Sequence, residues 1–368
     1  MSEISETKSK ERIKVKTVVF RILLVFFTLI FLLVGGLFCG VWIFEFGPSE
    51  KARDLFVVSM METSAAKFLA TSFLGEEKVN EILEANSLKA VSGISDSNLV
   101  VINPNGNKNP SGSNDDPSGQ KPTIPGSDGQ EIDPDGDGID VVDVKGSTFK
   151  GKMMIVYDPT RVFVGVSGLF GPDESGRPIT DIYHSYDNVV AGINGGGWYD
   201  PNGLGSGGQP LGIVISNGEV LWGTPMSSSW ECCGITEEGK LIVGTFTVQE
   251  AVDMGIVNAL KYGPTLIVDN VPTESLGAGS GLNPRTAIGQ RADGAILLLA
   301  VEGRHSDSMG ASYVDMQDVM LKFEAVNAYN LDGGNSTTMI YNDELIVKNG
   351  FRNMCTTFLV RGQTDEQN

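Results

Sequence analysis

Histidine and cysteine are both scarce in this chain of 368 residues, which has two histidines and four cysteines. A Ser-His-Asp triad is not supported, because neither His184 nor His305 lies near a nucleophile-elbow sequence. Four cysteines are too few for a disulfide scaffold in a chain of this length, and no spacing resembles a zinc site. These shortages argue against triad hydrolases, zinc enzymes and disulfide-stabilised small domains.

The cysteines themselves leave two alternatives open. Cys232 and Cys233 are adjacent, Cys355 is distant, and Cys39 lies in an apolar segment. A disulfide bond from the adjacent pair to Cys355 would suit an extracellular domain, and buried free thiols would suit it equally.

Basic residues are also scarce, with 27 lysines and arginines against 46 acidic residues and a net charge of −19. Such a surface repels polyanions, and the chain has no basic stripe, so nucleic acid is not expected as a partner. An anionic substrate would have to be held by a few well-placed arginines. This requirement draws attention to Arg285 and Arg304.

Long apolar runs are absent except for Ile22 to Phe44, which contains no charged residue. A helix of this length rises roughly 34 Å, enough to cross a bilayer core of about 30 Å. Residues 1–21 hold six basic and three acidic residues, a net charge of +3. The positive-inside rule therefore predicts a cytoplasmic tail (1–21), a single-pass membrane helix (22–44) and an extracytoplasmic remainder. A cleaved signal peptide or a lipoprotein-like cut at Cys39-Gly40 is the alternative.

A juxtamembrane stalk is predicted over residues 48–102. Leu55, Val58 and then either Met61 or Glu62 recur at helical spacing within a stretch from Glu50 to Ser87. The stalk is expected to pack on itself or on a second copy of the chain, so self-association through it is left open.

Residues 103–138 are predicted to form a flexible acidic linker. They consist mainly of Asn, Pro, Gly, Ser and Asp, with Ile124 and Ile132 as the only large apolar residues. The end of this segment, Asp133 to Gly138, has the carboxylate spacing of a calcium loop, but Val144 stands where the loop's twelfth-position glutamate belongs. A solvated linker is favoured over a calcium site, and neither metal nor cofactor is expected.

Residues 139–362 are predicted to form one sheet-dominated α+β domain, because short apolar runs alternate with glycine-rich turns. Asn217-Gly218 and Asn342-Asp343 indicate hairpins. Helices are expected over Thr247–Ala259 and over Ser312–Ala325, the second beginning with a capping box formed by Ser312 and Asp315.

Three short blocks in this domain combine charge with glycine or proline at the edge of an apolar run. Asp332 follows a strand and precedes Gly333-Gly334, so its carboxylate can face a cleft or simply cap the turn. Arg304 can bind phosphate through its forked guanidinium or pair with Glu302. Arg285 follows a proline in a stiff loop.

Other polar positions are weaker candidates for binding substrate. Asn194, Gly195 and Gly196 offer consecutive backbone amides that can form an anion-binding nest or a plain turn. The remaining candidates adjoin the charged blocks: His305, Gly333, Gly334, Ser336 and Thr337.

As a set and in this order, the four blocks resemble the signature of the phosphodiester glycosidase family. They are Asn194-Gly195-Gly196, Pro284-Arg285-Thr286, Gly303-Arg304 and Leu331-Asp332-Gly333-Gly334. The chain departs from the family pattern with Gly197 before Trp198 and with Asn335 before Ser336.

The resemblance implies an enzyme that hydrolyses the glycosyl–phosphate bond of a sugar-1-phosphodiester in a cell-envelope or exopolysaccharide glycan. Asp332 and Glu302 would then be the carboxylates, with Arg285 and Arg304 holding the phosphate. Which carboxylate is the nucleophile or base stays open. The rival hypothesis is a membrane-anchored wall-polysaccharide binding or assembly protein with the same fold and no catalysis.

Overall fold

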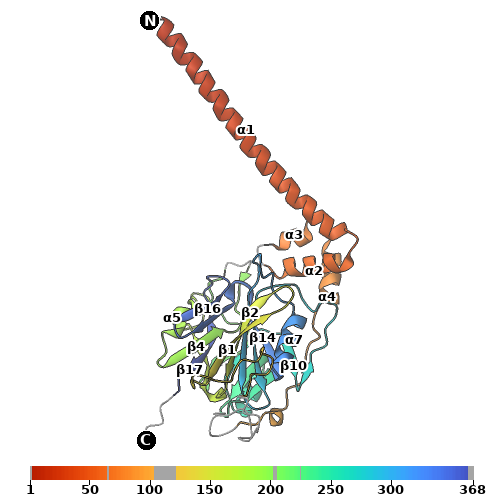
Figure 1. Cartoon of the computed structure of the whole chain (residues 1–368), viewed down its shortest axis with the longest axis vertical. Helices are drawn as coiled ribbons and strands as arrows, with labels where there is room; N and C mark the ends of the chain where they lie inside the picture. The colour runs from red at the N-terminus through yellow and green to blue at the C-terminus, as the bar shows by residue number, and fades with distance from the viewer. Residues whose placement is uncertain (1, 64–65, 103–121, 202–204, 224, 364–368) are drawn as a thin grey trace.

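The computed structural model describes residues 2–63, 66–102, 122–201, 205–223 and 225–363. A long N-terminal helix, α1 (Ser2–Phe46), projects from a domain built mainly of strands, with three short helices at the junction (Figure 1). The predicted α+β, sheet-dominated class is therefore confirmed.

Helix α1 contains one segment, Lys16–Phe46, that is long and apolar enough to cross a membrane. The predicted span from Ile22 to Phe44 lies within it. Its side chains are largely uncovered by the rest of the protein, as Phe31 at 75% and Leu33 at 73% exposure show. A segment of this length and composition fits a membrane anchor or a signal sequence.

The predicted helical stretch from Glu50 to Ser87 is divided into three helices. They are α2 (Glu50–Met61), α3 (Lys67–Thr71) and α4 (Glu76–Ala85). They share a small core of their own, made of Val57, Val58, Ala70, Val79 and Ile82.

The chain after α4 then runs along the strand domain, with isolated bridges from Leu88 to Ser275 and from Ile94 to Gly244. The predicted stalk thus packs on the domain as well as on itself. Its self-association stays a prediction.

Three antiparallel sheets form the domain. The seven-stranded sheet has the order β1-β2-β13-β12-β14-β10-β11. Its strands are β1 (Ile139–Lys145), β2 (Lys150–Val156), β13 (Ile296–Val301), β12 (Arg285–Arg291), β14 (Ala325–Leu331), β10 (Thr265–Val268) and β11 (Val271–Pro272).

The other two sheets have five strands each. The first is β16 (Glu344–Lys348), β15 (Thr338–Tyr341), β4 (Val189–Asn194), β17 (Thr356–Arg361) and β3 (Val162–Val166), in spatial order. The second is β6 (Glu219–Trp222), β5 (Val214–Ser216), β9 (Ile256–Leu260), β7 (Ser229–Thr236) and β8 (Leu241–Thr247).

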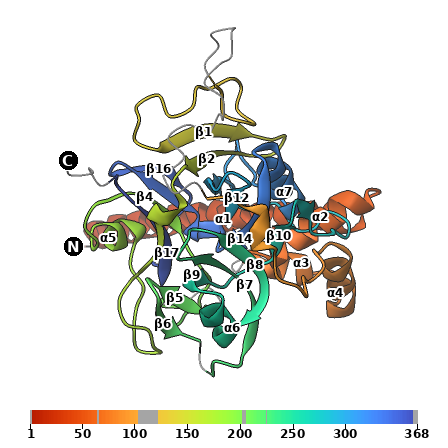
Figure 2. The same ribbon diagram turned by 90° about the horizontal axis from the view of Figure 1, so that it is seen from below.

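A common core lies between the three sheets and receives side chains from each, including Met154, Val214, Ile288 and Phe358. Each sheet also has an outer face that packs against one helix. The seven-stranded sheet packs against α7 (Tyr313–Lys322), and the five-stranded sheets pack against α5 (Ile179–Tyr183) and α6 (Val248–Asp253) (Figure 2). These layers fix the strand ends that carry the charged blocks.

Local sequence signals predicted several of these elements. The hairpins β5–β6 and β15–β16 turn at Asn217 and Asn342, both with positive φ. Helix α7 begins with the predicted capping box of Ser312 and Asp315. The predicted helix Thr247–Ala259 is wrong beyond Asp253, because Gly255 has a φ of 72° and the apolar run after it pairs as β9.

The described part of the predicted linker, residues 122–138, is not a free tether. Ile124 is 2% exposed in the core beside α7, and Ile132 packs against the same core. Two isoleucines are too few to form a core, but they suffice to fix a segment on one that already exists. The packed domain therefore begins before Ile139. Residues 103–121 lie outside the described residues.

The described cysteines are all free, and Cys232, Cys233 and Cys355 are buried. Burial raises the pKa of each of these three thiols. The structure therefore favours the buried-thiol alternative.

Candidate active site

Strand register brings the three charged blocks to one edge of the seven-stranded sheet. Strand β12 lies between β13 and β14 and runs antiparallel to both, so its start meets their ends. Arg285 pairs with Val301, and Thr286 pairs with Leu331. Arg304 and Asp332 follow those partners closely, which is why residues far apart in the sequence meet here.

Arg285 is buried, at 5% exposure, and fully engaged. Its Nε donates to the Ala311 carbonyl (3.2 Å), and its Nη2 donates to the Gly281 carbonyl (2.9 Å). The guanidinium stacks on Tyr313, with its carbon 4.1 Å from the ring centroid. Burial opposes its charge, but Tyr313 and Glu62 outweigh that effect and raise the pKa of Arg285. It is a fixed cation.

Arg304 is exposed and more loosely held. Its guanidinium donates to Asn283 (3.0 Å), Thr63 (3.1 Å) and Asn335 (3.3 Å). Although the residue as a whole is exposed, its guanidinium lies among neighbouring side chains, and this partial burial, followed by the Arg285 charge, lowers the pKa of Arg304. Its backbone has a φ of 62°. Residues other than glycine seldom adopt this conformation, and when they do they are often found at functional sites.

The C-terminal end of α2 reaches into this site. The Glu62 carboxylate accepts hydrogen bonds from Arg285 Nη2 (2.5 Å), Asn283 Nδ2 (2.6 Å) and the Gly281 amide (3.2 Å). The neighbouring Ser59 hydroxyl accepts from the Leu282 amide (2.9 Å). Three donors from the strand domain therefore converge on one anionic group. We call these donors, from Gly281, Asn283 and Arg285, the anion cradle.

Asp332 lies at the end of β14 and is partly buried. Burial raises the pKa of Asp332 to about 6, against smaller opposing effects from the Ser336 hydroxyl, the Arg352 guanidinium and the Gly333 amide. The Gly333 amide donates to its Oδ1 (2.9 Å). A carboxyl group with this pKa can hold or release a proton near neutral pH, as acid and base catalysts do.

Asn194 positions the Asp332 backbone from a second sheet. Its Nδ2 donates to the Asp332 carbonyl (2.5 Å), while its Oδ1 accepts from Thr286 (2.9 Å) and Thr338 (3.1 Å). Asn194 is fully buried, so its amide joins the two sheets below the site.

Of the two alternatives for Gly195 and Gly196, an anion nest or a plain turn, the hydrogen bonds of their amides do not favour the nest. The Gly195 amide donates to the Thr356 carbonyl and the Gly196 amide donates to the Thr356 hydroxyl, both at a distance of 3.0 Å. A Cβ at Gly195 would lie 2.7 Å from the Thr356 carbonyl oxygen, so the glycine is required by close strand packing.

Glu302 is not brought to Asp332 by any described contact. Its carboxylate pairs with Lys150 (3.3 Å), which also pairs with Asp307. The alternative of a Glu302–Arg304 ion pair is likewise not found among the described side chains. The carboxylate that acts on Asp332 is Asp200, whose charge raises the Asp332 pKa and which pairs with Arg352.

The weaker candidates fall into two groups. Gly334 lies beneath the Arg304 guanidinium, where a Cβ would be 3.5 Å from the guanidinium nitrogens, and it adjoins Gly333. Ser336 and Thr337 are fully buried behind that turn. His305 is exposed, and its backbone exchanges hydrogen bonds with Ser308.

The sequence patterns missed several residues at this site: Glu62, Thr63, Asn283, Tyr313, Asp200 and Arg352. Two of them carried a signal. Asn283 immediately precedes the block Pro284-Arg285-Thr286, and Glu62 occupies a position where the helical repeat of α2 favours an apolar residue. A charged residue in an apolar repeat marks a polar contact, although it does not reveal the partner.

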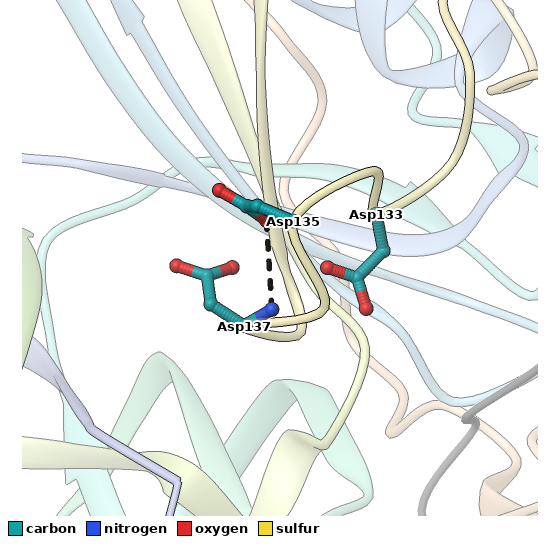
Figure 3. A group of neighbouring side chains, drawn as sticks. All are labelled: Asp133, Asp135 and Asp137. Carbon is teal, nitrogen blue, oxygen red and sulfur yellow. Dashed lines mark hydrogen bonds between the residues drawn. The ribbon is translucent and has the colours of Figure 1, made fainter.

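One acidic group elsewhere has the geometry to hold a metal ion. The carboxylates of Asp133, Asp135 and Asp137 lie within 4.8 Å of one another in the loop before β1 (Figure 3). All three already accept a hydrogen bond from a backbone amide: Asp133 from Gly138, Asp135 from Asp137 and Asp137 from Ile139. The group belongs to the packed start of the domain and does not adjoin Asp332 in any described contact.

Comparison with known proteins identifies the domain. Residues 187–360 match the family described as phosphodiester glycosidase. This domain belongs to the phosphodiester glycosidase family. The match includes Asn194, Arg285, Arg304 and Asp332 and ends within β17.

Two curated relatives match shorter stretches. N-acetylglucosamine-1-phosphodiester alpha-N-acetylglucosaminidase of Bos taurus is 28% identical over 156 residues, covering 38% of this chain and 29% of the relative. The SPbeta prophage-derived uncharacterized protein YomE of Bacillus subtilis is 32% identical over 158 residues, covering 40% of this chain and 23% of the relative. The matches thus span about a quarter of the relatives' length.

A solved structure supports the fold. The zebrafish N-acetylglucosamine-1-phosphodiester alpha-N-acetylglucosaminidase catalytic domain, described as auto-inhibited by its pro-peptide, superposes with a TM-score of 0.50 at 20% identity. The similarity covers 61% of this chain and 82% of the zebrafish domain.

Proposed function

We propose that this protein hydrolyses the glycosyl–phosphate bond of a sugar-1-phosphodiester. The family of the domain supports the reaction class, and the N-acetylglucosamine-1-phosphodiester specificity in the relatives' names supports the choice of substrate. The candidate membrane helix supports an envelope location, with residues 1–21 in the cytoplasm and the domain outside. The substrate would accordingly be part of a cell-envelope or exopolysaccharide glycan.

The anion cradle is the observation that carries this proposal. A guanidinium, a side-chain amide and a backbone amide all donate to the Glu62 carboxylate, beside the second guanidinium of Arg304. Planar guanidinium groups and convergent N–H donors are the groups that bind phosphate oxygens. We infer that Glu62 occupies the position of the substrate phosphate, and that the end of α2 withdraws when substrate binds.

Asp332 then supplies the chemistry at the sugar. Its ionised carboxylate takes a proton from water as the water oxygen bonds to the anomeric carbon of the sugar. The bond between that carbon and the phosphate oxygen breaks, and its electron pair leaves with the phosphate monoester. Arg285 and Arg304 stabilise the departing charge. A phosphate leaves more readily than an alkoxide, so the reaction needs less help from a second carboxylate.

The test is hydrolysis of N-acetylglucosamine-1-phosphodiesters by the purified full-length chain and by a Glu62→Gln variant, followed as sugar release. The variant should have a KM several-fold lower than the parent, because a neutral amide competes poorly with phosphate for the cradle. Glu77→Gln, an exposed change on α4, is the matched control and should leave KM unchanged.

A Glu62→Gln variant with a higher KM and a lower melting temperature would show that Glu62 is a structural partner of Arg285, contrary to the proposal. Absence of sugar release by parent and variant across several sugar phosphodiesters would favour the non-catalytic glycan-binding protein.

A further inference from the structure

Helix α2 and the turn after α3 pack against the last turns of the candidate membrane helix. Phe44 of α1 stacks on Phe56 of α2 with ring centroids 5.1 Å apart, and Phe38 meets Phe73 at 5.8 Å. Val41 and Glu45, one turn apart on α1, are buried at 4% and 3% exposure. The anchor and the helices below it are therefore one packed unit.

The contact of Phe73 with Phe38 sets the height of α3 relative to the bilayer. Phe38 lies eight residues before the end of the candidate span at Phe46, which is about 12 Å along the helix axis. The turn after α3 thus lies at the level of apolar residues of the anchor. Trp, Phe and Leu side chains are typical of segments that lie in the membrane interface.

Exposed aromatic side chains in this region match that position. Phe68 on α3 is 54% exposed, Phe73 is 42% exposed, and Trp42 on α1 is 54% exposed. Continuity with the apolar surface of α1 identifies a bilayer as the environment that covers these side chains.

Helices α2 and α3 also hold the candidate active site close to the exposed aromatic side chains and the apolar surface of α1. Glu62, in the anion cradle, precedes Phe68 by six residues, which span at most about 20 Å. Figure 1 shows α3 between α1 and the strand domain. Contacts of Ser59, Glu62 and Thr63 with the strand domain join the anchor directly to the cradle.

We propose that the substrate is a membrane lipid carrying a sugar-1-phosphodiester headgroup, presented to the site while its hydrocarbon chain stays in the bilayer beside α3. The proposal rests on the proposed function and narrows its substrate class. Water adds to the anomeric carbon, the free sugar departs, and the phosphate monoester stays on the lipid. A site held at this height reaches a lipid headgroup without the protein leaving the membrane.

The experiment uses the full-length chain reconstituted into phosphatidylcholine and phosphatidylglycerol vesicles. Two substrates share an N-acetylglucosamine-1-phosphodiester headgroup, one with a hexadecyl chain that inserts in the vesicle and one with a soluble methyl group. We expect kcat/KM for the hexadecyl substrate to exceed that for the methyl substrate by at least tenfold. Equal values for the two substrates would overturn the inference.

Variants of the exposed aromatic side chain separate membrane presentation from catalysis. Phe68→Ser should reduce turnover of the hexadecyl substrate several-fold and leave turnover of the methyl substrate unchanged. Phe68→Trp should restore the higher kcat/KM for the hexadecyl substrate. Val252→Ser, a comparably exposed apolar position on α6, should change neither rate.

A Phe68→Ser variant that keeps the full ratio of kcat/KM between the hexadecyl and methyl substrates would count against the role of α3. Hydrolysis of the methyl substrate alone would sustain the proposed function and contradict this inference. Hydrolysis of neither substrate would overturn both.

Discussion

The site has two walls that differ in construction. The strand wall consists of Arg285, Arg304 and Asp332 at the joined ends of β12, β13 and β14, where register fixes every position. The helix wall consists of Ser59, Glu62 and Thr63, held to the domain by polar contacts. Rigid strands suit groups that must stay in place for chemistry, and a few polar contacts suit a segment that moves. We therefore propose that the strand wall carries out catalysis and that the helix wall controls access to the site.

The largest effect should come from Asp332→Asn in the strand wall. The change preserves size but removes the charge that we propose accepts the proton from water. We expect turnover of a sugar-1-phosphodiester to fall at least about 100-fold, the scale of general base catalysis. Melting at pH 7 should be unchanged or slightly higher, since a partly buried charge is removed. Full activity in this variant would refute the role of Asp332.

The two arginines should respond differently to replacement by lysine. Arg304→Lys loses the fork at an exposed position, so kcat/KM should fall roughly tenfold with little change in melting temperature. Arg285→Lys removes the guanidinium hydrogen bonds to the Ala311 and Gly281 carbonyls and should also cost about 1–3 kcal/mol of unfolding free energy. Kinetics and denaturant unfolding on both variants check this. Equal unfolding free energies would contradict the assignment of Arg285 as the fixed cation.

The dependence of kcat/KM on pH tests whether Asp332 acts as the base. Because Asp332 must be ionised to act as a base, kcat/KM should rise as pH passes its pKa of about 6 and level off above it. A profile without an acid limb near this value would show that the carboxylate is not the base.

The same group makes a smaller contribution to stability. Its folded pKa lies above its ordinary value of 3.8, so protonation favours the folded state below that value, and this contribution is lost as pH rises through about 6. Any stability advantage of Asp332→Asn at pH 7 should therefore vanish near pH 4. Thermal melting of both proteins at the two pH values measures it, and an advantage that grows on acidification would contradict the burial of the charge.

The sequence predicted the strand wall better than the helix wall. Arg285, Arg304 and Asp332 each adjoin an apolar run with glycine or proline, so local patterns marked them, and antiparallel pairing then brought them together. Glu302 carried the same local signal but faces Lys150, because side-chain direction depends on contacts that a pattern does not contain.

The sequence patterns did not predict contacts between segments that are distant in the sequence. No pattern around Glu62 predicts its partners Asn283 and Arg285, which are more than 200 residues away in the sequence. Ile124 likewise stands isolated in a polar segment, and only the core beside α7 explains its burial. Local rules placed the turns at Asn217 and Asn342 and the cap of α7 correctly, since these depend on neighbouring residues alone.

The most direct test of the account follows oxygen from water into the products. The full-length chain would hydrolyse an N-acetylglucosamine-1-phosphodiester in ¹⁸O-enriched water, and mass spectrometry would read the phosphate monoester, because the anomeric oxygen of a free sugar exchanges with water. Attack at the anomeric carbon, as the arrangement of Asp332 and the arginines predicts, leaves the phosphate monoester without ¹⁸O. Label in the phosphate monoester would show attack at phosphorus and contradict the account.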